Sequence, residues 1–497
     1  MANLKTLFKD TAIYGISSIA ARFINYLLVP IETYVWVAGG GQFGVITNVY
    51  SYIGLLIVIL TFGMETTFFR FANKDEEKAL MVYSTALRMV GFVALLFVML
   101  VMLFLDPITS WMGYAEHKSY IGTMAICVAI DVWSCILFDY LRYRHRPLKF
   151  AVLKVFNILL NVSLLSMFLL VFPHFNMTIP GLYEADGTPD VGVVFYVNLL
   201  CSVVTTLLLF KEMKGVAFGF DWDLCKRMLS YTWPMLILGL GGQLNQNASA
   251  ILFPFFYDGP ELEAKAQLGI YGGCIKIAMI MVIITQAFRF AYEPFVFGNK
   301  DADKKDAYAN IMKYYIIFTL LAFLCVTGFM DIIRFVVAPT YWEGLKVVPI
   351  VMAAEMMFGI YFNLSFWYKL TDRTIWGAYF SGLGCLVLIL IDIFLIPKFS
   401  YMACAWAGFA AYGISMVASY VFGQKYYPIN YPIKQIFCYV VLAVVLFFGM
   451  YAANRYLSIV PALVVNTLLL TVFVAYMAKK DFPLSSLPVV GKYFRRN

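Results

Sequence analysis

The sequence predicts an all-α integral membrane protein with 14 transmembrane helices, arranged as two parallel-repeat six-helix lobes plus two C-terminal helices. Three observations support this fold class. Long apolar stretches fill most of the chain, Lys and Arg alternate between the two sides of these stretches, and the two halves carry a weak internal repeat. Of the 497 residues, 62% are hydrophobic and only 13% are charged, which is too little polar surface for a soluble globule.

The apolar stretches define the helices in order. A helix needs about 20 apolar residues to cross ~30 Å of hydrocarbon. The expected spans are 11–37, 43–69, 80–105, 119–141, 148–172, 190–210, 228–256, 266–297, 308–330, 345–369, 373–397, 401–423, 433–453 and 456–478. The first is too long for the apolar region of a signal peptide and has no convincing cleavage site, so we expect it to be retained.

The distribution of basic residues tests this number of spans. With the N-terminus in the cytoplasm, loops on that side hold 26 Lys and Arg residues and the opposite loops hold six. This is the bias of the positive-inside rule, and one missed helix would invert every later loop. We therefore expect a multi-pass protein of the bacterial inner membrane with both termini in the cytoplasm. The net charge of +8 follows from this topology and indicates no nucleic-acid partner.

An internal repeat divides the chain. Residues 41–45 (Gly-Gln-Phe-Gly-Val) resemble residues 266–270 (Ala-Gln-Leu-Gly-Ile), and residues 71–75 (Phe-Ala-Asn-Lys-Asp) resemble residues 297–301 (Phe-Gly-Asn-Lys-Asp). The offset covers six spans, so the two copies share one orientation in the membrane. The predicted domains are an N-lobe at 1–210, a linker at 211–227, a C-lobe at 228–425, two further helices at 426–478 and a basic tail at 479–497.

Charged residues inside the spans are the candidate site residues, because a charge deep in the bilayer costs at least ~2.5–3.5 kcal/mol and should face a cavity or a partner. For an anionic head group we expect the cations Arg22, Arg70, Arg88, Lys276 and Arg289, since Arg offers forked donors to phosphate. As ion-coupling residues or counter-ions we expect the acids Glu65, Asp131, Glu293 and Glu355. Internal ion pairing is an open alternative for Glu65 with Arg70 and for Arg289 with Glu293.

Other functional motifs are absent from the sequence. The nine Cys form no CxxC pair and the three His fall in loops, so we expect no metal centre. There is no Walker motif, HExxH or GxSxG, which indicates that the chain is neither an ATPase nor a hydrolase. We expect no cofactor, with H⁺ or Na⁺ as the candidate coupling ions.

Three segments resemble a known family. They are the opening helix pair (8–15, 41–44 and 63–71), the basic segment 143–150, and the segments 367–373, 395–397 and 403–407. Together they resemble the multidrug/oligosaccharidyl-lipid/polysaccharide (MOP) exporter superfamily, specifically its Wzx-type polysaccharide flippase branch, over about residues 5–425. The resemblance implies two six-helix lobes in a V, and a cationic central cavity for which Arg22, Arg70 and Arg289 match best.

The resemblance also implies a function. It implies transfer of a polyprenyl-diphosphate-linked oligosaccharide from the cytoplasmic to the outer leaflet, by alternating access and without ATP hydrolysis, for O-antigen, capsule or exopolysaccharide assembly. The expected partners are this lipid-linked substrate, membrane lipids and a polysaccharide polymerase or glycosyltransferase. A peptidoglycan-precursor (lipid II) flippase, a cation-coupled multidrug antiporter and a membrane-embedded glycan polymerase stay open as alternatives.

Overall fold

The computed structural model confirms the all-α class: 87% of it is helix, and no β-strand forms within the described residues. The structure describes residues 19–20, 23–74, 76–214, 216, 221–297, 305–371 and 373–481. At residues 76, 234, 238, 290–291 and 293–297 it describes the backbone alone.

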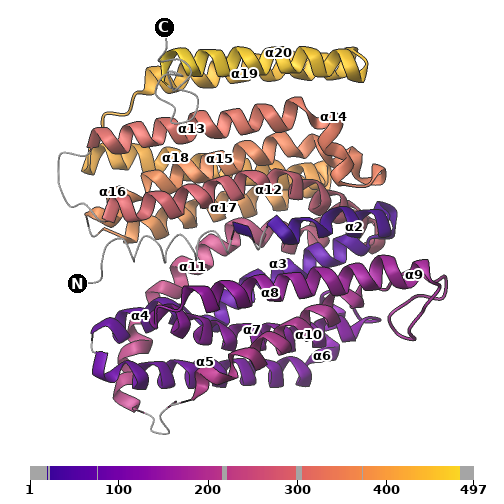
Figure 1. The fold of residues 1–497 in the computed structure, drawn as a ribbon, viewed down its shortest axis with the longest axis vertical. Coiled ribbons are helices and arrows are strands. Elements are labelled where there is room, and N and C mark those ends of the chain that lie inside the picture. The colour runs from indigo at the N-terminus through magenta and orange to yellow at the C-terminus, as the bar shows by residue number, and fades with distance from the viewer. Residues whose placement is uncertain are drawn as a thin grey trace. The chain divides into compact units, whose positions relative to one another are not determined.

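The chain, whose helices are labelled in Figure 1, forms two compact units. Unit 1 comprises Met1–Gly273 and Ile375–Ala411, and unit 2 comprises Cys274–Thr374 and Tyr412–Asn497. The units are groups of residues that pack together, whereas the predicted lobes are defined by the repeat. The lobe boundaries therefore stay a prediction.

The helices of unit 1 follow the chain in order. They are α2 (Leu28–Val35), η1 (Ala38–Gly40), α3 (Gln42–Thr61), α4 (Met64–Lys74), η2 (Glu76–Lys78), α5 (Ala79–Leu103), α6 (Leu105–Trp111), α7 (Lys118–Tyr143), α8 (Pro147–Ser166), η3 (Met167–Val171), α9 (Phe172–His174), α10 (Gly192–Leu209), η4 (Phe210–Met213), α11 (Trp222–Phe256) and α17 (Ile375–Phe399). Two helices, α12 (Glu261–Phe297) and α18 (Tyr401–Tyr426), begin in unit 1 and end in unit 2.

The remaining helices belong to unit 2. They are α13 (Lys305–Gly328), α14 (Met330–Ile333), η6 (Arg334–Val336), η7 (Pro339–Val347), α15 (Val348–Leu364), α16 (Phe366–Leu370), α19 (Ile433–Tyr456) and α20 (Ile459–Lys480).

Within the described residues, twelve helical segments are long and apolar enough to cross a membrane. They correspond to twelve of the predicted spans. The described part of the first span is a shorter apolar helix, Phe23–Val35. The seventh falls within α11, a 35-residue helix that contains the polar segment 243–247 and is not among the twelve. The prediction of fourteen spans therefore stays a prediction.

The second span is broken rather than continuous. Phe62 and Gly63 adopt left-handed backbone angles, with φ of 38° and 75°, and separate α3 from α4. Gly63 suits this conformation because it has no Cβ, and any Cβ there would lie 2.7 Å from the Cβ of Met235. The break starts a new helix inside the expected span, and this helix carries Glu65 in its first turn and Arg70 farther along.

Two glycines of the internal repeat lie against each other in unit 1. A Cβ added to Gly44 would lie 1.8 Å from the carbonyl oxygen of Lys265 and 3.1 Å from the amide nitrogen of Gly269. A Cβ added to Gly269 would lie 2.9 Å from the amide nitrogen of Gly44. The backbones of α3 and α12 thus approach so closely that neither position accepts a side chain.

In unit 2 the hairpin of α19 and α20 packs on α13, and polar contacts fix it at two places. At the first, the buried Lys313 ammonium donates to Asp481 (2.6 Å) and to Gln435 (3.3 Å), and the Tyr439 hydroxyl donates to Asp481 (2.5 Å). Lys313 is one of the 26 basic residues counted in the cytoplasmic loops, but it lies buried within α13. Burial raises the pKa of the Asp481 carboxyl, but the hydrogen bonds from Lys313 and Tyr439 outweigh burial and hold the pKa below its usual value.

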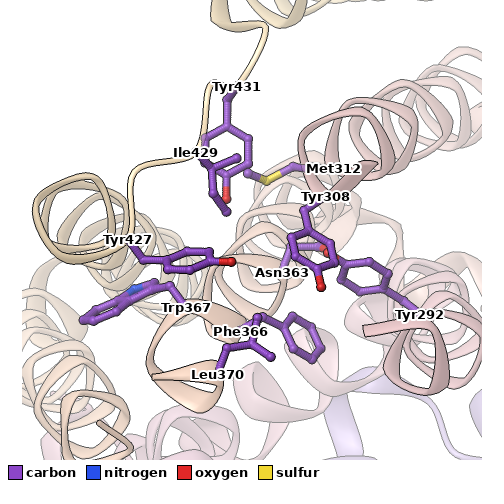
Figure 2. Close-up of a pocket in the computed structure, with 10 residues that line it drawn as sticks. All are labelled: Tyr292, Tyr308, Met312, Asn363, Phe366, Trp367, Leu370, Tyr427, Ile429 and Tyr431. Atoms are coloured by element: carbon purple, nitrogen blue, oxygen red, sulfur yellow. The ribbon is translucent and has the colours of Figure 1, made fainter. Parts of the chain in front are cut away.

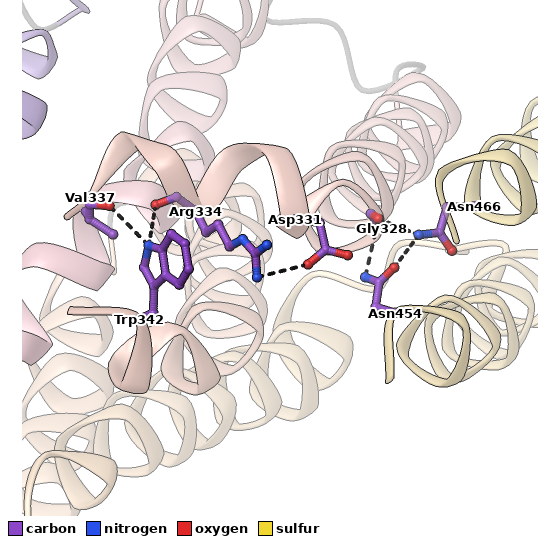
Figure 3. Close-up of polar contacts among 7 residues, drawn as sticks. All are labelled: Gly328, Asp331, Arg334, Val337, Trp342, Asn454 and Asn466. Carbon is purple, nitrogen blue, oxygen red and sulfur yellow. Dashed lines mark hydrogen bonds and ion pairs between the residues drawn. The ribbon is translucent and has the colours of Figure 1, made fainter. Parts of the chain in front are cut away.

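The second contact is at the C-terminal end of α13 (Figure 3). The Asn466 amide donates to the Gly328 carbonyl (2.6 Å) and to the Asn454 side chain (2.6 Å), and Asn454 also donates to Gly328 (3.4 Å). These bonds satisfy a helix-end carbonyl and join the two amide side chains, while the Asn466 side-chain oxygen stays buried without a hydrogen-bond partner. Each end of the hairpin is therefore held to α13 by hydrogen bonds that are partly or fully buried.

We expect Gly44→Ala to lower the thermal unfolding midpoint of the purified protein, because overpacking a tight contact costs about 1–3 kcal/mol. Gly242→Ala in α11 is the matched control, since no atom lies within 4 Å of a Cβ added there. Equal midpoints for the two variants would show that the α3–α12 contact has room for a methyl group.

We expect Lys313→Met to loosen the α19–α20 hairpin, because breaking a buried ion pair costs about 3–5 kcal/mol. Hydrogen exchange of α19 and α20 measures this loss. The exposed Lys346–Glu343 pair supplies the control Lys346→Met, which should cost less than about 1 kcal/mol.

The stability of the hairpin should also depend on pH. Because the pKa of Asp481 is lowered on folding, the stabilisation that this carboxylate contributes is present above its unfolded pKa. It is lost as the pH falls through the folded pKa, so acid should loosen the wild-type hairpin but change Lys313→Met less.

Candidate functional site

A cationic pocket lies between α4 and α11 in unit 1 and encloses about 410 Å³. It is lined by Arg70, Phe71 and Lys74 of α4 and by Arg227, Ser230 and Tyr231 of α11. Among these described lining residues, three carry positive charge and none carries negative charge. Arg70, Lys74 and Arg227 are exposed, so the pocket presents its cations to whatever enters it.

Local helix geometry explains how these side chains meet. Arg70 and Lys74 are four residues apart on α4, and Arg227 and Tyr231 are four apart on α11, so each pair lies on one helical face. The opposite face of α4 is apolar and buried through Met64, Phe68 and Ala72. The α11 helix begins at a sequence-encoded cap, because the Asp221 carboxylate accepts a hydrogen bond from the Leu224 amide (2.9 Å).

An aromatic ring positions one of the cations. The Arg70 guanidinium lies 4.1 Å from the centre of the Tyr231 ring, and Phe71 meets the same ring edge-on at 6.3 Å. Stacking on the ring face leaves the edge donors of a guanidinium available to a ligand. Three cations around an open pocket provide the chemistry to bind a phosphate or diphosphate.

A second feature of unit 1 is a polar cavity of about 310 Å³ among α3, α7, α8 and α10. Asp131 of α7, Lys154 and Asn157 of α8, and Asn198 of α10 line it. Asn157 donates to the Thr205 hydroxyl (2.7 Å), and the Lys154 ammonium lies 4.1 Å from the centre of the Phe138 ring. Lys154 is one of the 26 basic residues counted in the cytoplasmic loops, but it lies on α8 and lines this cavity together with the predicted acid Asp131.

Unit 2 contains an aromatic pocket that is much smaller (Figure 2). It is lined by Tyr292, Tyr308, Met312, Asn363, Phe366, Trp367, Leu370, Tyr427, Ile429 and Tyr431. Figure 2 shows these side chains arriving from several helices around one gap, but the free volume is about 10 Å³, room for about one water. The pocket is therefore too small for a sugar ring in this conformation.

The five predicted head-group cations do not form one described site. Arg22 lies outside the described residues, and Arg70 lines the cationic pocket. Arg88 is half-buried on α5 of unit 1 and is not a lining residue of that pocket. Lys276 and Arg289 are half-buried on α12 in unit 2, where the Arg289 guanidinium lies 4.1 Å from the Phe362 ring centre.

The four predicted acids also lie in different places. Glu65 accepts a hydrogen bond from the Cys135 thiol (3.4 Å), while its proposed partner Arg70 stacks on Tyr231 instead. Asp131 lines the polar cavity, and Glu355 is half-buried on α15. The side chain of Glu293 lies outside the described part of the chain.

Sequence reasoning missed Lys74, Arg227 and Tyr231, because it assigned the first two to loops. One signal was present: Lys74 belongs to the repeated segment 71–75 and lies four residues after Arg70. Nothing in the sequence indicates that Arg227 and Tyr231, more than 150 residues later, meet that segment.

Similarity to known proteins is found at the level of structure. No protein-family model matches the sequence, and no curated protein matches it. The chain is similar to the lipid II flippase MurJ in an inward closed conformation, with a TM-score of 0.70 and 13% identity, covering 94% of this chain and 99% of that one.

Multidrug transporters are similar as well. An inward-facing multidrug resistance MATE family transporter of the MOP superfamily has a TM-score of 0.64 and 13% identity, covering 81% of this chain and 93% of its own. A MATE protein in complex with MaD3S has a TM-score of 0.57 and 15% identity, covering 86% and 98%. The chain therefore shares the fold of these structures, and its twelve long apolar helices within the described residues support a multi-pass membrane protein.

Proposed function

We propose that the protein is a flippase that moves a polyprenyl-diphosphate-linked oligosaccharide from the cytoplasmic to the outer leaflet of the bacterial inner membrane, for assembly of a cell-surface polysaccharide. The observation that carries this proposal is the cationic pocket, in which Arg70, Lys74 and Arg227 surround about 410 Å³. This volume falls within the range of ~300–1,000 Å³ typical of small-ligand sites.

Charge and geometry both favour a diphosphate. Guanidinium groups donate two parallel hydrogen bonds to phosphate oxygens, and Lys74 adds a point charge. A diphosphate carries several negative charges, which three cations without a lining acid can offset. The pocket does not suit a cationic drug, because like charges would repel it.

The proposed topology places this pocket where such a substrate is made. By the positive-inside rule, Lys74, Arg227 and their neighbours belong to the cytoplasmic side. Both termini then lie in the cytoplasm. The pocket would thus bind the head group at the cytoplasmic face, before transport.

A lipid II flippase is the second candidate, and a specific observation favours it. The similarity to MurJ extends over 94% of this chain, compared with 81–86% for the MATE structures given above. Lipid II is also a diphosphate-linked lipid, so the cationic pocket suits either substrate. The two candidate substrates differ in their glycan, and we assign none of the pocket residues to glycan binding.

Coupling to H⁺ or Na⁺ is part of the proposal. Asp131 is the best placed of the predicted acids, since it borders a polar cavity of about 310 Å³ inside the helix bundle. Buried carboxylates that face a hydrated cavity are the groups that transporters use to carry ions.

We expect the pocket to bind pyrophosphate, measured by calorimetry on the purified protein in nanodiscs. Arg70→Ala or Arg227→Ala should weaken binding about 10-fold or more, because one hydrogen bond to a charged group contributes about 1.5–3 kcal/mol. Lys226→Ala is the matched control, since Lys226 is equally exposed on α11 but does not line the pocket. Uniform weakening in all three variants would indicate non-specific attraction and remove the pocket from the site.

The cellular test is complementation of flippase-deleted strains at equal membrane expression. We expect the wild type to restore surface glycan in an oligosaccharide-flippase mutant of matched glycan type, and Arg70→Ala to accumulate the lipid-linked precursor. Rescue of a lipid II flippase mutant instead would identify the second candidate. If the protein confers drug resistance and rescues neither mutant, both flippase proposals are wrong and an antiporter is favoured. A reporter fused after residue 480 would show on which side of the membrane the C-terminus lies.

A further inference from the structure

A cluster of metal-ligating side chains lies where α4 meets α7 in unit 1. Cys135 and Asp139 are four residues apart on α7 and share one face. Glu65 reaches them from the first turn of α4, just after the break at Phe62 and Gly63. The Cys135 sulfur lies 3.4 Å from a Glu65 carboxylate oxygen, and one ligand atom from each of the three residues lies within 4.8 Å of the others.

A buried oxygen atom in this cluster has no hydrogen-bond partner. Asp139 is 3% exposed. Its Oδ1 accepts a hydrogen bond from Arg142 (3.1 Å), but its Oδ2 is buried and unpaired. An unpaired carboxylate oxygen is costly in an apolar bundle, and a bound cation would satisfy it. This observation is independent of the clustering itself.

The charges around the cluster leave a deficit of positive charge. Lys154 interacts with Glu65, Asp131 and Asp139, and Arg142 pairs with Asp139. With a neutral thiol, three carboxylates face two cations. With the thiol deprotonated, four anions are balanced by these two cations and one divalent ion.

The polar cavity borders the cluster. Cys135 lines that cavity together with Asp131 and Lys154. Its volume of about 310 Å³ is room for about ten waters. The cavity therefore has room for a hydrated ion beside the thiol.

We propose that Glu65, Cys135 and Asp139 bind a divalent transition-metal ion of the Zn²⁺ class. A thiolate with two carboxylates favours such an ion over Mg²⁺ or Ca²⁺, which select oxygen ligands alone. Water from the cavity completes a four-coordinate site. Binding transfers the Cys135 thiol proton to solvent and forms the metal–sulfur bond.

The bound ion would link α4 to α7 and so restrict the movement of α4, the helix that carries Arg70. The scattered cysteines predict no metal centre, because the third ligand comes from a helix about 70 residues away. The proposal does not depend on the proposed transport function.

The test is a Co²⁺ titration of the full-length protein, stripped with a chelator and held in nanodiscs. We expect one Co²⁺ per chain, a thiolate-to-cobalt charge-transfer band, and loss of that band when Zn²⁺ is added. Cys135→Ser and Asp139→Asn should each weaken binding at least about 100-fold, because even an outer-shell partner is typically worth 10–100-fold. Zn²⁺ should also raise the thermal midpoint of the wild type and not of these variants.

Cys127→Ser is the matched control. Cys127 lies on the same helix, 3.9 Å from one carboxylate oxygen of Asp131, but does not belong to the cluster. It should leave the cobalt band unchanged. Glu65→Gln, on the other helix, repeats the test if the α7 variants do not fold. Absence of the band in the wild type, or its equal loss in Cys127→Ser, would overturn the proposal.

Discussion

The close approach of α3 and α12 at Gly44 and Gly269 is the contact on which unit 1 depends. A methyl group at Gly44 would lie 1.8 Å from a backbone oxygen, so the contact sets how near the two helices lie. The same helix α3 packs on α7 and α11, and its far end breaks at Phe62 and Gly63 to start α4. The position of α3 therefore sets the position of α4, and so the positions of Glu65 and Arg70.

Satisfying polar groups inside apolar helices is the second constraint. A charge or an open hydrogen-bonding group in the bilayer costs several kcal/mol, so each needs a partner or water. Lys313 is paired with Asp481, and the Asn48 amide donates to the Ala250 carbonyl (2.8 Å). The fully buried Asp392 accepts a hydrogen bond from Ser249 (2.7 Å) at one carboxylate oxygen, while its Oδ1 has no hydrogen-bond partner. The Oδ2 atom of Asp139 is likewise unpaired.

Only part of the cationic pocket can be predicted from the sequence. Arg70 is predictable, because a cation within an apolar span needs a reason to be there. Lys74 and Arg227 cannot be predicted as site residues, because a basic residue at the end of a span gives the same sequence pattern whether it sets the topology or binds a ligand. The distinction depends on which helix ends meet, and α4 meets α11 only through packing of residues about 150 positions apart. Lys154 illustrates the reverse case, because it was counted with the loops but lines a cavity together with the half-buried Asp131.

By itself, the sequence determined the helical class and the approximate position of twelve spans, because hydrophobic length is a local property that one segment carries alone. The internal repeat also indicated that Gly44 and Gly269 occupy matching positions in its two copies. Only the tertiary structure decided that these glycines touch, that the second span breaks into α3 and α4, and which charges share a pocket. Such contacts join residues distant in sequence, and their energies depend on packing and dielectric surroundings that no single segment encodes.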